Sequence, residues 1–326
     1  MANESTSRAR TVVRTRLTAA SVDPRLLALA GASVASLTGS FIKLSGVSPA
    51  TSTFFRCLLA LPVLGFMASR EFRRHGAVAS RVLAAQAFGG LMLGVDFALW
   101  ARSIDMIGAG ISTVVVNVQV VVVPLLAWIF FREKVPVRFL VAVPFLFSGV
   151  ALAGGVLGGG GEGNQLVAGT LLALGAGVSY GIYIFASGRA GSAQRASTQV
   201  FVSTIAAGVV GTAVGSLWGT VDLTPGWHAM WWLVTLSLSG QVLGWVLIGF
   251  ALPRLSSEVG ATLLLAQPVM AVGFSIVLVH ERPSVSQLVG CAVVVASVWV
   301  VARSRTTRRR RPDTAPALVP DVVRNT

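Results

Sequence analysis

The chain has 326 residues, of which 54% are apolar and 12% are charged, and its mean hydropathy is +0.77. Soluble domains carry roughly 25% charged residues, so this composition excludes an ordinary water-soluble protein and indicates a membrane protein. The net charge of +14 would suit a nucleic-acid-binding protein, but the positions of the basic residues, described below, exclude that class.

Apolar runs of about 20 residues, long enough to cross the ~30 Å hydrocarbon core of a bilayer as helices, recur along the chain. A polar, arginine-rich segment precedes the first run, which is too long and lacks the small-residue cleavage site of a removable signal peptide. We predict ten membrane-spanning helices and no separate soluble domain. Their approximate spans are 26–46, 51–69, 82–101, 109–131, 138–157, 166–187, 197–218, 230–251, 258–280 and 285–302.

The second half of the chain repeats the first. A shift of 150 residues places 88–94 on 238–244, and a later shift of 148 places Gln119 on Gln267. The predicted fold class is therefore an all-α membrane protein in which ten helices form two five-helix repeats. Such duplication is typical of secondary transporters, whose repeats enclose a substrate site near the middle of the bilayer.

The basic residues gather on one side of the predicted helices. All but four of the 26 Lys and Arg residues fall in the tails and in loops on that side; Lys43, Arg102 and Arg282 lie in the opposite loops and Arg56 lies within a span. The positive-inside rule then predicts that both termini are cytoplasmic, in a multi-pass protein of the plasma membrane. Because each repeat has an odd number of helices, the second repeat is expected to be inverted relative to the first.

These features divide the chain into five segments. Two repeats are joined by a glycine-rich linker on the outer side and flanked by two basic tails that contact the lipid bilayer. Their predicted bounds are 1–24 for the first tail, 25–157 for the first repeat, 158–165 for the linker, 166–303 for the second repeat and 304–326 for the second tail.

Repeat-related glycines also indicate where the helices pack. Gly90 and Gly94 form a GxxxG pair whose counterpart in the second repeat is Gly240 and Gly244. In a bilayer, such pairs allow two helix backbones to approach closely. We therefore expect Gly90 and Gly240 to lie at tight helix contacts.

Several marks of the repeat resemble one protein family. The second half has a Gln267-Pro268 step within the ninth span and Glu281 thirteen residues after the proline. The first half has Arg56 in the second span and Glu133 at the end of the fourth. This pattern resembles the EamA-type unit of the drug/metabolite transporter superfamily over most of residues 26–302. The resemblance implies a ten-helix carrier of amino acids, other small metabolites or drugs, often an exporter.

One position departs from that pattern. Val120 occupies the place that corresponds to Pro268, and a proline follows at Pro124 instead. Proline breaks or kinks a helix because it lacks an N–H group. We therefore expect the two repeats to kink at different depths.

Asp96 is the only acidic residue that lies well inside a predicted span, and an ionisable residue there is a functional candidate. Arg56 comes to a similar depth on the neighbouring antiparallel helix, so the two side chains can meet. Two interpretations stay open. The pair either anchors the second and third spans as a buried ion pair or hydrogen bond, or it takes part in substrate binding or proton coupling.

Seven further polar or aromatic residues within the spans are candidates for the substrate site. Each could instead serve only in hydrogen bonds between helices, worth about 1 kcal/mol. Gln119 and Gln267 are the strongest pair, because they are repeat-related and each lies beside a helix break or its vestige, where released carbonyl groups can line a cavity. The seven are Asn117, Gln119, Tyr180, Tyr183, Gln241, Trp245 and Gln267.

Glu133 and Glu281 suggest a structural role. Each directly precedes a predicted helix, where a carboxylate stabilises the positive end of the helix dipole.

We interpret the chain as a secondary transporter that exports a small metabolite, with uptake on the same scaffold as the nearest alternative. An integral membrane enzyme would need clustered catalytic groups, but all three histidines fall at helix ends or in loops. A channel is disfavoured because no ring of like charges is evident. We expect no cofactor, no metal and no nucleic-acid partner. A monomer is sufficient because both repeats lie in one chain, and a homodimer stays open.

Overall fold

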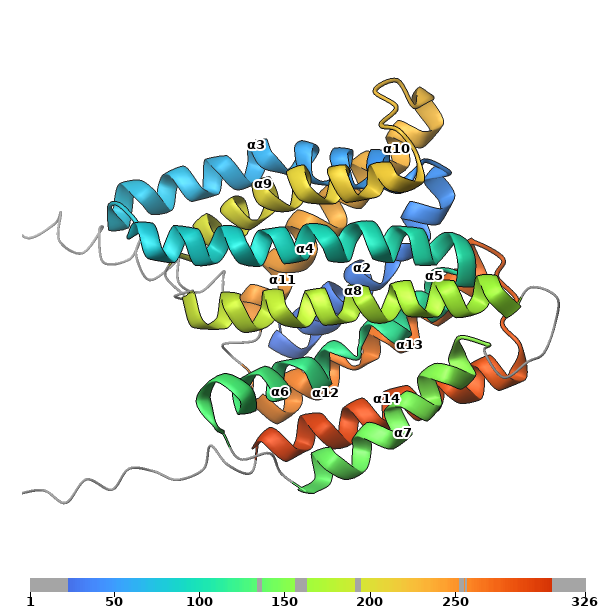
Figure 1. Ribbon diagram of the computed structural model, residues 1–326. Helices are drawn as coiled ribbons and strands as arrows, with labels where there is room; N and C mark the ends of the chain where they lie inside the picture. The colour runs from blue at the N-terminus through green and yellow to red at the C-terminus, as the bar shows by residue number, and fades with distance from the viewer. Residues whose placement is uncertain are drawn as a thin grey trace, which may run out of the picture.

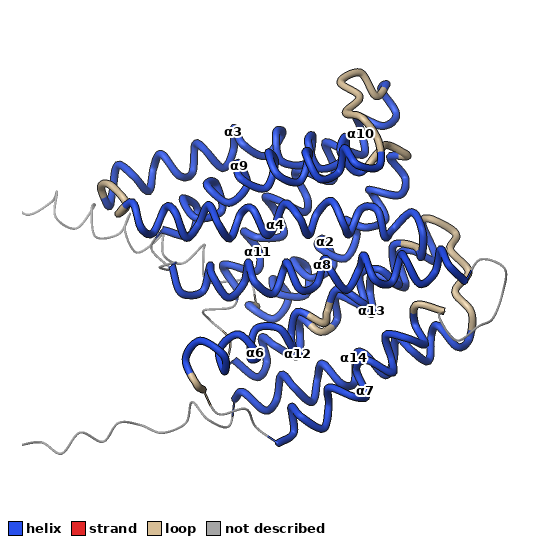
Figure 2. Tube along the Cα trace, viewed as in Figure 1, coloured by secondary structure: helices blue, strands red, loops and turns tan. Residues whose placement is uncertain are grey.

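A computed structural model describes residues 23–133, 137–155, 163–190, 195–251, 255 and 257–306. Most of the predicted tails, and residues 158–162 of the predicted linker, lie outside this part. Within it the secondary structure is helical and no strand occurs (Figure 1; helices are blue in Figure 2). The elements are α2 (Pro24–Ser45), α3 (Pro49–His75), α4 (Ser80–Ile107), α5 (Ala109–Val116), α6 (Gln119–Phe131), α7 (Val137–Ala153), α8 (Gly163–Ala190), α9 (Ala196–Gly215), η2 (Ser216–Trp218), α10 (Gly226–Leu236), η3 (Ser237–Leu243), α11 (Gly244–Ala251), α12 (Ser257–Leu264), α13 (Ala266–Leu278) and α14 (Val285–Thr306).

Each of the ten predicted spans coincides with helix in the structure. The fourth span consists of α5 and α6, the eighth of α10, η3 and α11, and the ninth of α12 and α13. Within the described residues, 6 helices are long and apolar enough to cross a membrane: α2, α3, α4, the α5–α6 segment, α8 and α9 with its short extension. The described part of the chain is thus all-helical, and its apolar helices indicate a multi-pass membrane protein.

The two repeats break their helices at equivalent positions, so the expected difference in kink depth is wrong. Asn117 and Val118 separate α5 from α6, and Leu265 separates α12 from α13; the shift of 148 relates Asn117 to Leu265. Asn117 Nδ2 donates to the carbonyl oxygen of Thr113 at 2.8 Å, so this side chain competes with the backbone for a helix acceptor. Pro124 lies inside α6 without ending it. Pro268 lies in the first turn of α13, where a missing N–H is tolerated.

The two broken helices also end in the same way. Arg132, after α6, and His280, after α13, both adopt left-handed backbone conformations, with φ angles of 51° and 59°. The next N–H group, of Glu133 and Glu281 respectively, donates to a carbonyl oxygen six residues earlier, at 3.4 and 3.2 Å. In both repeats the same backbone bond therefore closes the end of the helix. The sequence repeat is therefore also a repeat of local structure.

The helices of the two repeats are interleaved. In Figure 1, α4 of the first repeat packs against α8 and α9 of the second, and α14 of the second repeat lies along α7 of the first. α3 contacts α9, and α2 contacts α11 and α13. We call the end of the bundle where α2 begins and α3 and α14 end the tail side (left in Figure 1), and the opposite end the far side.

Gly90 lies at a close contact between α4 and α9. A Cβ atom at Gly90 would be 2.5 Å from the carbonyl oxygen of Ser203 and 2.7 Å from its Cα. A Cβ atom at Gly240 would be 2.4 Å from Cγ2 of Thr38 on α2. Both expected contacts are present, and the contact at Gly90 is the stricter one because backbone atoms cannot rotate away as a side chain can.

Replacing Gly90 with leucine is expected to reduce the yield of folded protein strongly. The new side chain must displace the α9 backbone, and such overpacking typically costs about 1–3 kcal/mol or more. The measurement is the monodisperse yield and melting temperature of detergent-solubilised protein. Gly273→Leu is the matched control, because a Cβ there has no neighbour within 4 Å among the described residues. A wild-type yield and melting temperature for Gly90→Leu would contradict the prediction.

Candidate functional site

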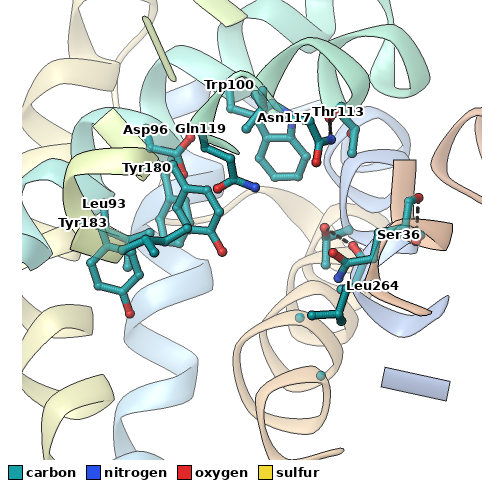
Figure 3. A pocket seen from close by; sticks show the side chains of 18 of the residues that line it. Ser36, Leu93, Asp96, Trp100, Thr113, Asn117, Gln119, Tyr180, Tyr183 and Leu264 are labelled. Carbon is teal, nitrogen blue, oxygen red and sulfur yellow. Dashed lines mark hydrogen bonds between the residues drawn. The ribbon is translucent and has the colours of Figure 1, made fainter. Parts of the chain in front are cut away.

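A cavity of about 700 Å³ lies between helices of both repeats. Figure 3 shows residues of α4, α6 and α8 on one side of it, facing Ser36 of α2 and Leu264 of α12 on the other. The cavity also extends toward the tail side, because Val200, near the start of α9, and Ile248, near the end of α11, line it. Its size is typical of sites for small organic molecules, roughly 300–1,000 Å³.

The candidate residues chosen from the sequence converge on this cavity. Trp245 lies on α11, but its side chain is outside the part of the chain that the structure describes. The others all line the cavity: Arg56, Asp96, Asn117, Gln119, Tyr180, Tyr183, Gln241 and Gln267.

Arg56 projects from α3 and is 8% exposed. Its Nε donates to Oε1 of Gln241 at 3.3 Å, and its Cζ lies 3.8 Å from the centre of the Phe97 ring. Its Nη1 is buried and has no hydrogen-bond partner among the described residues. The guanidinium group is therefore held along one edge and leaves a donor unused.

Gln241 belongs to η3, a π-helical turn that interrupts the eighth span. Its Nε2 donates to Oγ1 of Thr204 on α9 at 3.3 Å. Ser237, at the start of the same turn, donates from Oγ to the carbonyl oxygen of Arg56 at 2.9 Å. π-Helical turns often occur at functional sites because they re-aim side chains. Here the turn contacts both the backbone and the side chain of Arg56.

Asp96 projects from α4 and is 5% exposed. Its Oδ1 is buried without a hydrogen-bond partner, and it forms no ion pair with Arg56. The interpretation of these two residues as a buried ion pair is therefore not the arrangement in the structure. Buried charges are normally paired or hydrogen-bonded, because removing them from water is costly. An acidic and a basic side chain that line one cavity without forming an ion pair are consequently unusual.

Amide side chains lie at both helix breaks. Gln119 follows the break between α5 and α6, and its Oε1 is buried without a partner among the described residues. Gln267 follows the break between α12 and α13, and its backbone carbonyl oxygen accepts a hydrogen bond from Ser36 Oγ at 2.9 Å. The structure thus brings the repeat-related glutamines to the same cavity.

Aromatic side chains form much of the remaining lining. The rings of Tyr180 and Tyr183 stack with their centres 5.9 Å apart. Phe97 and Trp100 also line the cavity, although they are not among the site residues predicted from the sequence. Phe97 is next to Asp96 in the sequence and Trp100 lies one helical turn after it, so their positions could have identified them as residues of the same site.

Hydroxyl groups of α2 were missed as well. Ser36 and Thr38 line the cavity, and Thr204 of α9 supports Gln241. A signal was available, because Ser33, Ser36, Thr38 and Ser40 give the otherwise apolar first span an unusual number of hydroxyl groups.

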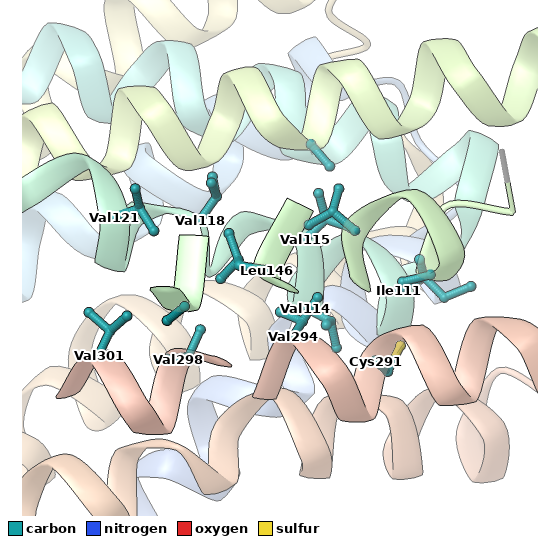
Figure 4. Packing of buried hydrophobic residues seen from close by; sticks show 14 of the residues in the cluster. Ile111, Val114, Val115, Val118, Val121, Leu146, Cys291, Val294, Val298 and Val301 are labelled. Carbon is teal, nitrogen blue, oxygen red and sulfur yellow. The ribbon is translucent and has the colours of Figure 1, made fainter. Parts of the chain in front are cut away.

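A tightly packed apolar cluster adjoins the cavity. Figure 4 shows valines of α5, α6 and α14 interlocking with Leu146 of α7 and Cys291 of α14. Val298 belongs to this cluster and also lines the cavity. The polar site is therefore bounded on this side by a dry core.

Glu281 connects the two repeats on the far side. One of its carboxylate oxygens accepts from the N–H of Ala109 at 2.7 Å and the other from Gly110 at 3.3 Å, at the start of α5. We expected it to stabilise the helix that follows it, and this is wrong, because its side chain caps a helix of the other repeat. Its counterpart Glu133 pairs instead with Arg189 at 3.1 Å, in an exposed position.

The arrangement suits binding by charge, hydrogen bonds and aromatic contact. Among the residues that the structure describes, no group of three or more His, Cys, Asp or Glu residues could hold a metal ion.

Comparisons with known proteins agree with this architecture. A family model described as the EamA-like transporter family matches residues 25–155 and 167–303, which together make up most of the chain. A solved structure titled only "Crystal structure of protein" is similar with a TM-score of 0.57 and 17% sequence identity, covering 88% of this chain and 99% of that one. At that identity, the similarity concerns the fold alone. No curated protein matches the sequence.

Proposed function

The chain belongs to the EamA-like transporter family, and from this premise we propose that it is a secondary transporter that moves a small polar or amphipathic metabolite out of the cell by alternating access. The observation that carries the proposal is the cavity between the two repeats. Residues that line it carry buried polar atoms without hydrogen-bond partners, and its lining extends toward one end of the bundle. Uptake on the same scaffold is the alternative.

Two features support alternating access. The broken helices α5–α6 and α12–α13 have equivalent breaks and equivalent ends, and they run in opposite directions along the bundle in Figure 1. A pair of repeats related in this way can exchange roles, so that the conformation of one repeat becomes that of the other. Glu281 caps α5 on the far side, whereas its counterpart Glu133 makes a different contact on the tail side. This asymmetry is what a state closed at the far side requires.

The charge distribution supports the assignment of sides. Because nearly all the basic residues fall in the tails and in the tail-side segments, the tail side is proposed to face the cytoplasm of a cell whose plasma membrane contains the protein. The structure then corresponds to an inward-facing state, in which a cytoplasmic metabolite can enter the cavity. Asp96, a buried carboxyl group in that cavity, is the proposed site at which a proton couples to transport.

The proposal is tested by comparing excreted metabolites and tolerance to amino acids and their analogues. The comparison uses cells that overexpress the wild-type chain, cells that express Asp96→Asn at the same level, and cells without the protein. We expect a solute to accumulate in the medium only with the wild type, together with greater tolerance to that solute. Accumulation inside the cells would support uptake instead. An unchanged set of solutes at confirmed expression would contradict both.

A further inference from the structure

We propose that α3 and α9, which belong to different repeats, form one rigid pair that moves as a unit during transport. The two helices lie side by side in the bundle (Figure 1). The inference rests on the proposed alternating access only in that some helix contacts must change between states. It adds that the contact between α3 and α9 is not one of them.

Two charged side chains fasten this pair on the tail side. Glu71, near the end of α3, accepts hydrogen bonds from the N–H groups of Ser197 and Thr198, in the first turn of α9, at 2.9 and 2.8 Å. Arg195, which precedes α9, donates in return to the carbonyl oxygen of Gly76, just after α3, at 3.0 Å. Each charge therefore meets the helix end of opposite polarity. We call the contacts of Glu71 and Arg195 the tail clasp.

Neutral groups fasten the same two helices on the far side. Ser48, the residue before α3, donates from Oγ to the carbonyl oxygen of Thr220, beyond the end of η2, at 2.9 Å. In the first turn of α3, Oγ1 of Thr51 accepts from the N–H group of Asp222 at 2.9 Å. The pair is thus fixed at both ends, and separating the helices at either end would break several hydrogen bonds at once.

Close packing joins α3 and α9 between these two ends. A Cβ atom at Gly211 of α9 would be 2.6 Å from Cγ2 of Thr53, and one at Gly215 would be 2.7 Å from the backbone nitrogen of Ala50. Small residues that allow such an approach are a common basis of helix association in a bilayer. The contact therefore extends along the helices and is not confined to their ends.

The broken helices are held on one side only. Glu281, after α13, caps α5 on the far side, whereas its counterpart Glu133 contacts Arg189 of α8. Alternating access opens one side of a carrier while it closes the other. A contact made on one side can be exchanged in this process, but a helix pair bonded on both sides takes no part in the opening. The moving boundary is therefore assigned to α5–α6 and α12–α13.

The experiment measures distances between spin labels by double electron–electron resonance, on the purified full-length chain in nanodiscs, with Cys57 and Cys291 replaced by serine. One pair of labels reports on each end of α3 and α9, and two comparison pairs report on the ends of the broken helices. The α3–α9 pairs are Arg73→Cys with Ala196→Cys and Val47→Cys with Ser216→Cys, and the comparison pairs are Arg73→Cys with Arg132→Cys and Ser216→Cys with Arg282→Cys.

The distances are recorded at acidic and at alkaline pH, with and without Glu281→Ala. We expect one narrow distance in both α3–α9 pairs under every condition. The comparison pairs are expected to give two distances whose proportions change with the conditions.

A variant tests whether the tail clasp fastens the pair. Glu71→Ala is expected to broaden the tail-side α3–α9 distance and to leave the far-side distance unchanged. Arg70→Ala is the matched control, because Arg70 precedes Glu71 and lies 4.7 Å from the ring centre of Phe66 in its own helix. An unchanged tail-side distance in Glu71→Ala would overturn the role of the clasp.

A cross-link tests the pair as a whole. A Cβ atom at Gly208 of α9 would be 3.1 Å from Cβ of Cys57 on α3, close to the ~3.5–4.5 Å found in disulfides. In a chain that retains Cys57, Gly208→Cys is oxidised with copper phenanthroline after maleimide spin labels have been attached to the comparison positions. We expect the comparison pairs to keep both distances, because the movement does not separate α3 from α9. Loss of one of the two distances would overturn the rigid pair.

The remaining outcomes separate this inference from the proposed function. A second distance in either α3–α9 pair would overturn the rigid pair and leave alternating access intact. A single distance in all four pairs under every condition would contradict alternating access, and with it the division into a rigid and a moving part.

Discussion

Asp96→Asn is expected to abolish accumulation of substrate driven by a pH gradient while leaving substrate exchange at saturating concentration intact. A carboxyl group can carry a proton across the transport cycle, whereas an amide cannot, and exchange of bound substrate needs no net proton transfer. The measurement uses proteoliposomes that contain the purified protein, with counterflow and gradient-driven uptake recorded on the same preparation.

The structure also defines the control for this experiment. Asp96 and Arg56 form no ion pair, so Asp96→Asn breaks no salt bridge to Arg56. Adding Arg56→Gln is therefore not expected to restore stability. Asp105→Asn on the same helix should transport normally. Normal gradient-driven transport by Asp96→Asn would exclude Asp96 as the proton carrier. If Asp96→Asn lowered the melting temperature and the added Arg56→Gln restored it, the interpretation of Arg56 and Asp96 as a structural pair would be supported instead.

Glu281→Ala is expected to open the far side of the cavity. The carboxylate caps two N–H groups of α5, and hydrogen bonds to a charged group are worth about 1.5–3 kcal/mol each. Their loss should shift the equilibrium toward the opposite-facing state by about tenfold or more. The readout is the rate at which an impermeant maleimide, added to the far side, labels Thr113→Cys in a variant whose Cys57 and Cys291 are serine.

Glu133→Ala is the matched control for this prediction. Glu133 is the repeat counterpart of Glu281, but it pairs with Arg189 on the tail side, so its loss should not increase labelling from the far side. An unchanged labelling rate in Glu281→Ala would show that this cap does not hold the far side closed. Equal increases in both variants would indicate general loosening of the bundle.

Much of the cavity was predictable because its polar residues are rare in an apolar sequence. Asp96 and Arg56 stood out by charge, and Gln119 and Gln267 by their matched positions in the repeat. Trp100 was missed because an aromatic residue in a membrane helix is as compatible with lipid contact as with a cavity. Only the rotation of each helix about its axis decides between these environments, and that rotation depends on the neighbouring helices.

Local rules explain which features could be predicted correctly. Hydropathy and periodicity are properties of short segments, so the ten helical spans follow from the sequence, with ends that differ from those in the structure by up to six residues. The close approach at Gly90 follows from the spacing of two glycines. The duplication is visible because equivalent residues recur at a shift of 150 and, after a two-residue deletion, at a shift of 148.

The tertiary structure decided what depends on contacts between distant segments. The positions of Pro124 and Pro268 suggested that the two repeats kink at different depths. Instead, the Asn117 side chain bonds to the backbone of its own helix, and the break of the first repeat lies at the position equivalent to Leu265. Arg56 could have met Asp96, but Gln241, which η3 brings beside it, holds its guanidinium group instead. Each result reflects competition among several partners for one polar group. Such competition is settled only when all the partners are in place, so the sequence by itself determined the helices, and the packing determined which charges remain free.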